Sequence, residues 1–168
     1  NCGEGALHQA AKLIIWQTAC ERIATKQPYS GSLLCWACRS SEVFCSNWLW
    51  RISQAFKEKS LCPGTRADVA FIGDERCLAV EVVVSHDLSE ATAAAYNTVG
   101  IPVLIVKPTS NGLERLRESL LVDRIENGKG SKTQSCAKCE KDRFNKEWDE
   151  YLDKRRWGIA PGGGGGGG

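Results

Sequence analysis

The chain has 168 residues, 42% of them hydrophobic and 25% charged, which is an ordinary composition for a folded domain with its own core. Its formal net charge is only +2, so any nucleic-acid-binding surface has to be local rather than molecule-wide. No apolar run reaches the roughly 18 residues of a membrane span, and no signal peptide opens the sequence. We therefore expect no membrane partner. The odd number of nine cysteines is untypical of a secreted disulfide framework and leads us to expect the reducing, intracellular cytoplasm.

The two ends of the sequence bound the predicted domain. Residues 161–168 are rich in glycine, with seven in succession, and such a segment cannot pack. We interpret it as a linker or placeholder and predict a single domain over residues 1–160. Because the first residue is Asn rather than Met, we expect a trimmed or processed piece of a longer chain.

Apolar residues recur at helical spacing over residues 6–26, and Pro28 ends this pattern, so the spacing predicts a first helix. His8 and Lys12 are four residues apart and therefore share one face of that helix. Residues 42–57 fit a strand followed by a helix, and the pattern leaves this assignment open.

A hairpin with two facing acids is predicted next. Strands over 66–72 and 77–84 flank the four-residue turn 73–76. Pairing across this turn keeps the sum of partner numbers constant, which places Asp68 opposite Glu81 with Cβ atoms about 5 Å apart. Facing like charges destabilise a hairpin, whereas a divalent cation such as Mg²⁺ binds carboxylate oxygens. The pair therefore suggests a metal-dependent hydrolase.

The alternative for the two acids is that they are solvated or paired with Arg66 and Arg76. A register shifted by one residue would also separate them, because neighbouring strand residues point to opposite faces.

A helix and a third strand follow the hairpin. Asp87 and Glu90 resemble a capping box at a helix start, and Gly100 is a typical helix end. The apolar run 101–106 then predicts a buried strand parallel to the second hairpin strand, because a helix connects the two. Further along, Leu113–Val122 fits a helix.

The C-terminal part is more polar. Residues 127–135 predict a loop, and residues 144–157 predict a charged amphipathic helix. Seven basic residues concentrate near this helix and either contact a phosphate backbone or form a solvated face; they are Lys138, Lys141, Arg143, Lys146, Lys154, Arg155 and Arg156.

These motifs resemble a known superfamily. Asp68 followed by Glu81-x-Val83 resembles the Asp…Glu-x-Lys core of PD-(D/E)xK nucleases, in which a hairpin presents the acids and a helix crosses to the next strand. The motif order is similar to that of the competence-protein CoiA-like group of this superfamily, over about residues 3–107 and the terminal Cys pair. The ordered motifs are His8-Gln-Ala-Ala-Lys12, Cys-x-x-Cys, Arg66-Ala-Asp-Val-Ala, Val80-Glu-Val-Val-Val-Ser-His86, Tyr96 and Gly100-Ile-Pro-Val-Leu.

The resemblance implies a restriction-endonuclease-like fold, with a mixed sheet and flanking helices, in which Asp68 and Glu81 hold Mg²⁺ or Mn²⁺. It also exposes a departure, because Val83 replaces the usual catalytic Lys. Lys12 is the predicted substitute, since its ammonium can stabilise charge on a phosphate oxygen. His8 on the same face is predicted to bind phosphate or relay a proton, the alternative for both being a surface position.

Ser85 and His86 follow the second hairpin strand. Ser85 shares the face of Glu81, so we predict that it orients a water molecule or a phosphate. The alternative is that Ser85 caps a helix and that His86 is a surface imidazole.

Nine cysteines include two Cys-x-x-Cys pairs, Cys35/Cys38 and Cys136/Cys139. This spacing lets two thiolates bind one Zn²⁺, and two such pairs complete a tetrahedral site of four sulfurs. Such a zinc knuckle assembly is closed to substrate and would stabilise the fold by joining distant parts of the chain. Replacement of one ligand by Cys45 or Cys62, and a redox role for Cys35/Cys38, remain open.

We therefore predict an α/β fold and a metal-dependent nuclease. Its predicted partner is nucleic acid, with DNA favoured over RNA, and a protein partner or a homo-oligomer is the alternative. The alternative is a catalytically inactive nuclease fold, stabilised by zinc, that binds nucleic acid or protein. Val83 favours this alternative. A third interpretation is a zinc-stabilised interaction domain in which the acids are incidental.

Overall fold

The computed structural model describes residues 2–39, 42–46, 52–74, 76–127, 130–132 and 135–156. The expected glycine-rich tail, residues 47–51 of the segment left open, and Trp157 of the last predicted helix lie outside the described residues.

The protein combines helices with two sheets. The helices are α1 (Cys2–Ala24), α2 (Glu90–Val99), α3 (Arg115–Glu118), α4 (Ala137–Arg156) and the short 3₁₀ helix η2 (Ser110–Gly112). The strands are β1 (Ser30–Leu34), β2 (Glu42–Ser46), β3 (Ile52–Lys59), β4 (Ala67–Gly73), β5 (Cys77–Val82), β6 (Val103–Val106), β7 (Ser119–Val122), β8 (Arg124–Asn127) and β9 (Gly130–Lys132). The expected mixed α/β class is confirmed.

The larger sheet has the strand order β3-β4-β5-β6-β8-β9, and the smaller has the order β2-β1-β7. In the larger sheet β5 and β6 are parallel and the other neighbours are antiparallel, so the sheet is mixed as predicted. Helix α2 connects β5 to β6, which confirms the predicted strand–helix–strand unit.

The predicted hairpin register is also confirmed. Val69 pairs with Val80, and Ile72 with Cys77, so the next pair outward is Asp68 with Glu81. The backbone N–H of Gly73 donates to the carbonyl of Arg76 at 2.8 Å and closes the turn. Alternating side chains on both strands and a short turn leave little freedom for another register.

Two apolar clusters cover the two faces of the larger sheet. On one face α1, α3, β1 and β7 pack against β4, β5 and β6; on the other face α2 packs against the same strands. The first cluster includes the fully buried Ile15, Phe71 and Leu104, and the second includes the fully buried Tyr96, Ala70 and Ile105. The acid pair lies on strands enclosed from both sides.

Helix α1 forms because its apolar residues keep one face to the sheet, where Ala11, Ile15 and Ala19 are fully buried. It ends where Lys26 adopts a left-handed backbone with φ of 54°, and Gln27 N–H donates to the Arg22 carbonyl at 2.9 Å. This helix carries His8 and Lys12 on its first three turns, towards the hairpin.

Several predicted elements are corrected. The helix predicted over Leu113–Val122 is only the single turn α3, because its last four residues pair as β7 with β1. Of the segment 42–57, the described residues 42–46 and 52–57 lie in two strands, β2 and β3, rather than in a strand and a helix, and 127–135 contains β9. These short segments are decided by a sheet partner distant in the sequence, which local periodicity does not reveal.

The start of α2 also differs from the prediction. Ser89, not Asp87, is the N-cap, and its hydroxyl accepts from the N–H of Thr92 at 3.1 Å. Asp87 instead forms an ion pair with Arg124 at 2.6 Å. The end is as predicted, with Gly100 at φ of 72°.

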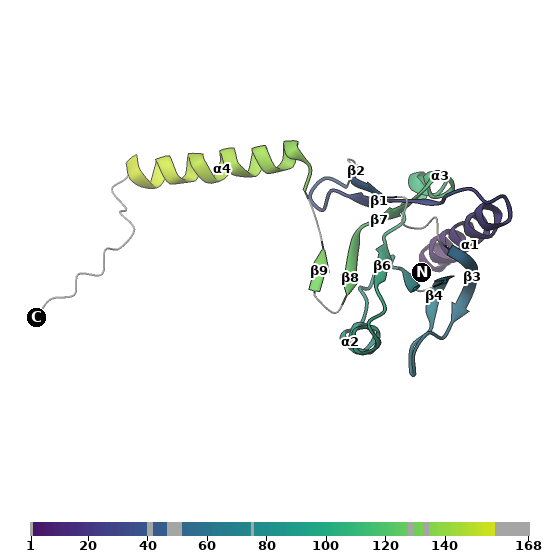
Figure 1. The fold of residues 1–168 in the computed structure, drawn as a ribbon. Coiled ribbons are helices and arrows are strands. Elements are labelled where there is room, and N and C mark those ends of the chain that lie inside the picture. Colours follow the sequence, from purple (N-terminus) through teal and green to yellow (C-terminus); the bar gives the residue numbers. More distant parts are fainter. Residues whose placement is uncertain are drawn as a thin grey trace, which may run out of the picture.

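Helix α4 extends away from the two sheets (Figure 1). It begins at Ala137, seven residues before the predicted start at 144, and ends at Arg156. Within the described parts of the chain, no helix combines the length and apolar character that crossing a bilayer requires.

Candidate functional site

Asp68 lies where β4 meets helix α1. Its Oδ2 accepts the backbone N–H of Val82 at 2.9 Å and lies 3.0 Å from Nε2 of His8. The Asp68 side chain is 17% exposed, so solvent only partly reaches these contacts. One oxygen of Asp68 is thereby anchored to the neighbouring strand and to α1.

Lys12 is the buried cation of the site. Its side chain is only 5% exposed, its ammonium donates to Oε1 of Glu58 at 2.7 Å, and Oδ1 of Asp68 lies 3.6 Å away. A buried ammonium without a counter-ion is costly, so these two carboxylates account for its position. The structure therefore brings Lys12 and His8 to Asp68, as the helix-face prediction required.

Glu81 projects towards helix α2 and is held by Tyr96. The Tyr96 hydroxyl donates to Oε1 of Glu81 at 2.8 Å. Burial raises the pKa of Glu81 to about 7; the hydrogen bond from Tyr96 and the charge of Lys12 oppose the rise, and the negative charge of Asp68 adds to it. The effect of Asp68 on Glu81 follows from their facing positions on β4 and β5.

Each of the two facing acids has one oxygen in a hydrogen bond, and Oδ1 of Asp68 also lies 3.6 Å from the Lys12 ammonium. Among the described residues, hydrogen bonds reach Oδ2 of Asp68 and Oε1 of Glu81, and none reaches Oδ1 of Asp68 or Oε2 of Glu81. Oxygen donors of this kind fit a hard divalent cation such as Mg²⁺ or Mn²⁺.

The residues after Glu81 take different positions. Val83 is 8% exposed and packs in the apolar cluster with Tyr96. Ser85 is exposed, and its hydroxyl lies 2.7 Å from Nδ1 of His86. The Ser85 hydroxyl is thus hydrogen-bonded to His86 and not to Asp68 or Glu81.

Two site residues were missed from the sequence. Tyr96 enters the sequence analysis only as a motif residue with no role at the site, although its hydroxyl donates to Glu81 at 2.8 Å. Glu58 was not singled out, although the β3–β4 register, with Lys57 opposite Val69, places it across from Asp68. A strand assignment for 52–59 would have revealed Glu58, since the same register arithmetic then applies.

Lys12 lowers the pKa of Glu58, first through the hydrogen bond and then through its charge. Nη2 of Arg66 also donates a hydrogen bond to Oε2 of Glu58 at 2.8 Å. The alternative pairing of Arg66 with the hairpin acids is therefore not what the structure shows: Arg66 pairs with Glu58.

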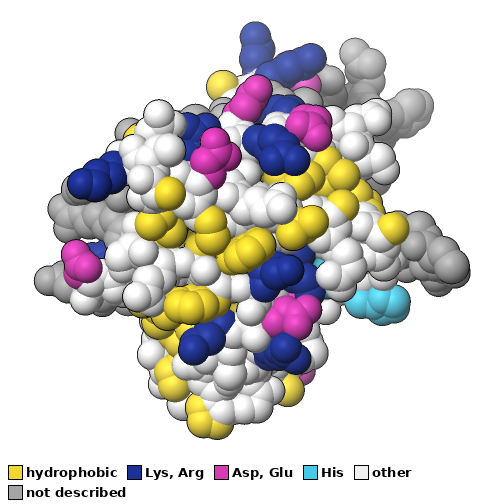
Figure 2. Space-filling model, turned by 90° about the vertical axis from the view of Figure 1, so that its right-hand side faces the viewer, with side chains coloured by type: hydrophobic (Ala, Val, Ile, Leu, Met, Phe, Trp, Pro, Cys, Tyr) yellow, Lys and Arg dark blue, Asp and Glu magenta, His cyan; other side chains and the backbone are white. Residues whose placement is uncertain are grey.

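The surface over α1 and β3 is electrically mixed (Figure 2). Lys and Arg side chains on this face are interspersed with Asp and Glu, and hydrophobic side chains form a band between them. A nucleic acid approaching from this side would meet separate cations rather than one basic field, in keeping with the net charge of +2.

The four predicted zinc ligands form a second cluster. The sulfurs of Cys35, Cys38, Cys136 and Cys139 all lie within 4.8 Å of one another. Cys35 directly follows β1 and the second pair begins α4, so the cluster joins the two parts of the chain. The N–H of Cys136 donates to Sγ of Cys35 at 3.3 Å.

This cluster can hold a metal ion such as zinc. Four sulfurs at 2.3 Å from one ion are about 3.8 Å apart, close to the 4.0 Å between Cys38 and Cys136. Backbone N–H groups, first that of Cys38, lower the pKa of the Cys35 thiol, which favours a thiolate ligand. The hydrogen bond with Cys136 raises the pKa of the Cys139 thiol.

The alternative ligands are not part of this cluster. Cys62 is buried, with its Sγ 2.7 Å from the hydroxyl of Thr65, and the side chain of Cys45 lies outside what the structure describes. The proximity of all four knuckle sulfurs favours metal binding over a redox dithiol made of Cys35 and Cys38 alone.

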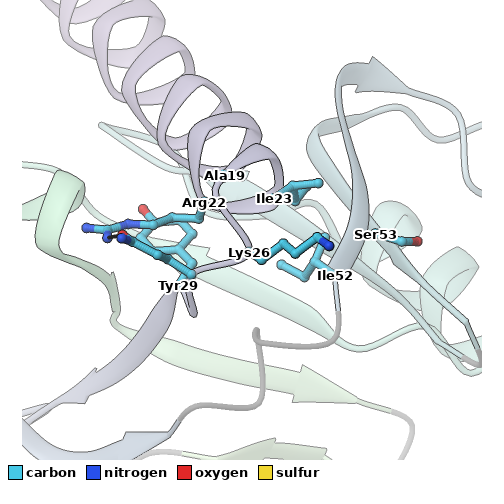
Figure 3. A pocket seen from close by; sticks show the side chains of 8 residues that line it. Ala19, Arg22, Ile23, Lys26, Tyr29, Ile52 and Ser53 are labelled. Atoms are coloured by element: carbon cyan, nitrogen blue, oxygen red, sulfur yellow. Dashed lines mark hydrogen bonds between the residues drawn. The ribbon is translucent and has the colours of Figure 1, made fainter.

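A separate cavity of about 350 Å³ lies at the far end of α1. Figure 3 shows Arg22 beside Tyr29 and the Lys26 side chain reaching towards Ile52 of β3. Its lining includes none of the predicted site residues. The acid pair and the cavity are therefore separate sites, and metal binding by carboxylates is a property of the acid pair alone among these two.

The chain was compared with family models, with curated proteins and with solved structures, and none of them matches it. The site is therefore interpreted from its own geometry.

Proposed function

We propose that this protein is a metal-dependent nuclease of restriction-endonuclease-like fold that hydrolyses phosphodiester bonds, with DNA as the expected substrate. The observation that carries the proposal is the buried Lys12 ammonium 3.6 Å from Asp68, on the strand next to Glu81. A fixed cation beside two facing carboxylates supplies from α1 the positive charge that Val83, directly after β5, lacks.

Asp68 and Glu81 would hold Mg²⁺ or Mn²⁺, and the oxygens without hydrogen bonds, Oδ1 and Oε2, are the donors that remain for it. Such an ion, when bound, lowers the pKa of water and polarises the scissile phosphate. Lys12 stabilises charge on a phosphate oxygen, and His8 orients Asp68 through the contact at Oδ2. Ser85 stays a candidate only for substrate contact from the exposed turn.

The four-cysteine cluster is proposed to be a structural zinc site. Four thiolates leave no open position for substrate, so the ion would not take part in cleavage. It would fix the start of α4 against the end of β1, and the basic residues of α4 become a second candidate contact for the nucleic acid.

Cleavage by variants of the acid pair tests the nuclease proposal. Single- and double-stranded DNA and RNA are incubated with the purified chain and Mg²⁺ or Mn²⁺, and products are followed on denaturing gels. We expect Asp68→Ala and Glu81→Ala to abolish cleavage, and Lys12→Met to lower kcat by about 100-fold, the typical cost of one lost charge-stabilising donor.

Glu114→Gln is the matched control, because Glu114 is an exposed acid at the start of α3, paired with Arg117 at 3.2 Å. It should cleave like the wild-type chain. Undiminished cleavage by both acid-pair variants, with circular dichroism showing intact folds, would end the nuclease assignment.

A second candidate is a catalytically inactive nuclease fold that binds nucleic acid or a protein. The burial of Val83 in an apolar cluster favours it, since no cation can stand at that position without losing this packing. It predicts binding in a gel-shift assay without any cleavage that depends on Mg²⁺ or Mn²⁺.

A further inference from the structure

The backbone of Glu58 adopts a conformation that is uncommon for a residue with a side chain. Its φ is 51°, inside strand β3, whereas Lys26, also at positive φ, follows a helix end where this is ordinary. Such backbone strain persists only where surrounding contacts enforce it, and it concentrates at functional sites. The contacts of Glu58 therefore indicate what enforces it.

Each carboxylate oxygen of Glu58 binds one cation. Oε1 accepts from the ammonium of Lys12 at 2.7 Å, and Oε2 accepts from Nη2 of Arg66 at 2.8 Å. Arg66 also donates from Nε to the backbone carbonyl of Glu58 at 2.9 Å. Arg66 thus fixes both the backbone and the carboxylate of Glu58, which in turn fixes Lys12.

The position of Lys12 matters because Asp68 is its other counter-ion. The ammonium is within hydrogen-bond distance of Glu58 but 3.6 Å from Oδ1 of Asp68, which is too long for a hydrogen bond. If Glu58 were neutral, the buried ammonium would have Asp68 as its nearest remaining anion and would move onto Oδ1. That oxygen is the one argued above to be left for a cation.

We propose that Glu58 is a positioning residue that holds the Lys12 ammonium off Oδ1 of Asp68, so that Lys12 and a divalent cation can serve the same site. This role rests on the proposed nuclease function. It assigns to Glu58 no contact with substrate, and it explains why a strained residue stands opposite Asp68 on the edge strand.

Glu58→Gln is the direct test, because it removes the charge and keeps the shape. We expect kcat to fall by about 10- to 100-fold, as is typical when a group that orients a ligand is removed. The Mn²⁺ concentration giving half-maximal rate should rise by about tenfold, while KM for the nucleic acid changes little. Direct titration of Mn²⁺ binding by electron paramagnetic resonance gives a readout that does not depend on cleavage.

A double-mutant cycle with Lys12→Met separates positioning from a general structural role. If Glu58 acts through Lys12, then Glu58→Gln has no further effect on kcat or Mn²⁺ binding in the Lys12→Met background. Glu114→Gln should leave both quantities unchanged in either background. Should Glu58→Gln fail to fold, Arg66→Gln enters the same cycle and should act in the same direction by a smaller factor.

The outcomes of the two proposals differ. Absence of Asp68-dependent cleavage by the wild-type chain overturns the nuclease assignment, and the role of Glu58 falls with it. The role of Glu58 alone is overturned if cleavage depends on Asp68 but the Glu58→Gln variant cleaves like the wild-type chain. It is also overturned if Glu58→Gln lowers kcat by the same factor with and without the Lys12→Met substitution.

Discussion

Tyr96 and Glu81 are joined by a hydrogen bond of 2.8 Å between the crossover helix and the second hairpin strand. The contact links the apolar cluster under α2 to the acid pair, because Tyr96 is fully buried in that cluster. It also favours the charged form of Glu81 in a setting whose burial favours the neutral form. The ionisation of Glu81 is therefore a measurable property of this site.

Glu81→Gln is expected to change the dependence of stability on pH. Burial raises the pKa of Glu81 from 4.5 to about 7, so the folded state binds its proton more tightly than the unfolded state does. The wild-type chain thus loses stability as pH rises from about 4.5 to about 7, and the glutamine variant lacks this loss. Above pH 7 the variant should be more stable, by up to about 3 kcal/mol.

Urea unfolding at pH 4.5, 6 and 8 in metal-free buffer measures this difference, with Glu114→Gln as the exposed control. A constant difference between Glu81→Gln and wild type across this range would contradict the buried position of the Glu81 carboxyl group.

Tyr96→Phe is expected to raise the pKa of Glu81 further. The lost hydrogen bond favoured the carboxylate, so its removal leaves burial and the charge of Asp68 less opposed. Carboxyl ¹³C NMR of glutamate-labelled protein, titrated without added divalent metal, should give a midpoint above that of wild type.

Tyr29→Phe is the matched control for this titration, because Tyr29 is an equally buried phenol in the other apolar cluster, bonded to the Leu116 carbonyl. It should leave the midpoint of Glu81 unchanged. An unshifted midpoint in Tyr96→Phe would show that the Tyr96 hydroxyl does not act on Glu81.

Zinc removal is expected to destabilise the fold. The purified chain should contain one zinc per molecule by elemental analysis, and Cys38→Ser or Cys139→Ser should lose it, since a site of four thiolates needs every ligand. The free energy of unfolding should fall by about 3 kcal/mol when the zinc concentration is about 100 times its Kd.

Cys20→Ser, outside the cluster on α1, should keep its zinc and most of its stability. Thermal unfolding with and without a chelator makes the comparison. Full zinc content in the Cys38 and Cys139 variants, or a melting temperature that a chelator does not lower, would rule out the zinc site.

The elements predicted correctly are those whose signals are local. Helical spacing in α1, the turn 73–76 and Gly100 each specify their own backbone, so the order of α1, hairpin, α2 and β6 follows from the sequence. The failures fall where distant partners decide. The local sequence of Ser119–Val122 favours a helix, but these residues pair with β1. Asp87 forms an ion pair with Arg124 instead of capping α2.

The sequence by itself determined the facing acids on the hairpin, the shared helix face of His8 and Lys12, and the two cysteine pairs, because register and spacing are properties of short segments. Only the tertiary structure decided that Lys12 is buried between Glu58 and Asp68, that Tyr96 contacts Glu81, and that the cysteine pairs meet. These contacts join residues on separate elements. Their geometry is set by packing across the sheet and by the left-handed backbone of Glu58, which no local sequence pattern predicts.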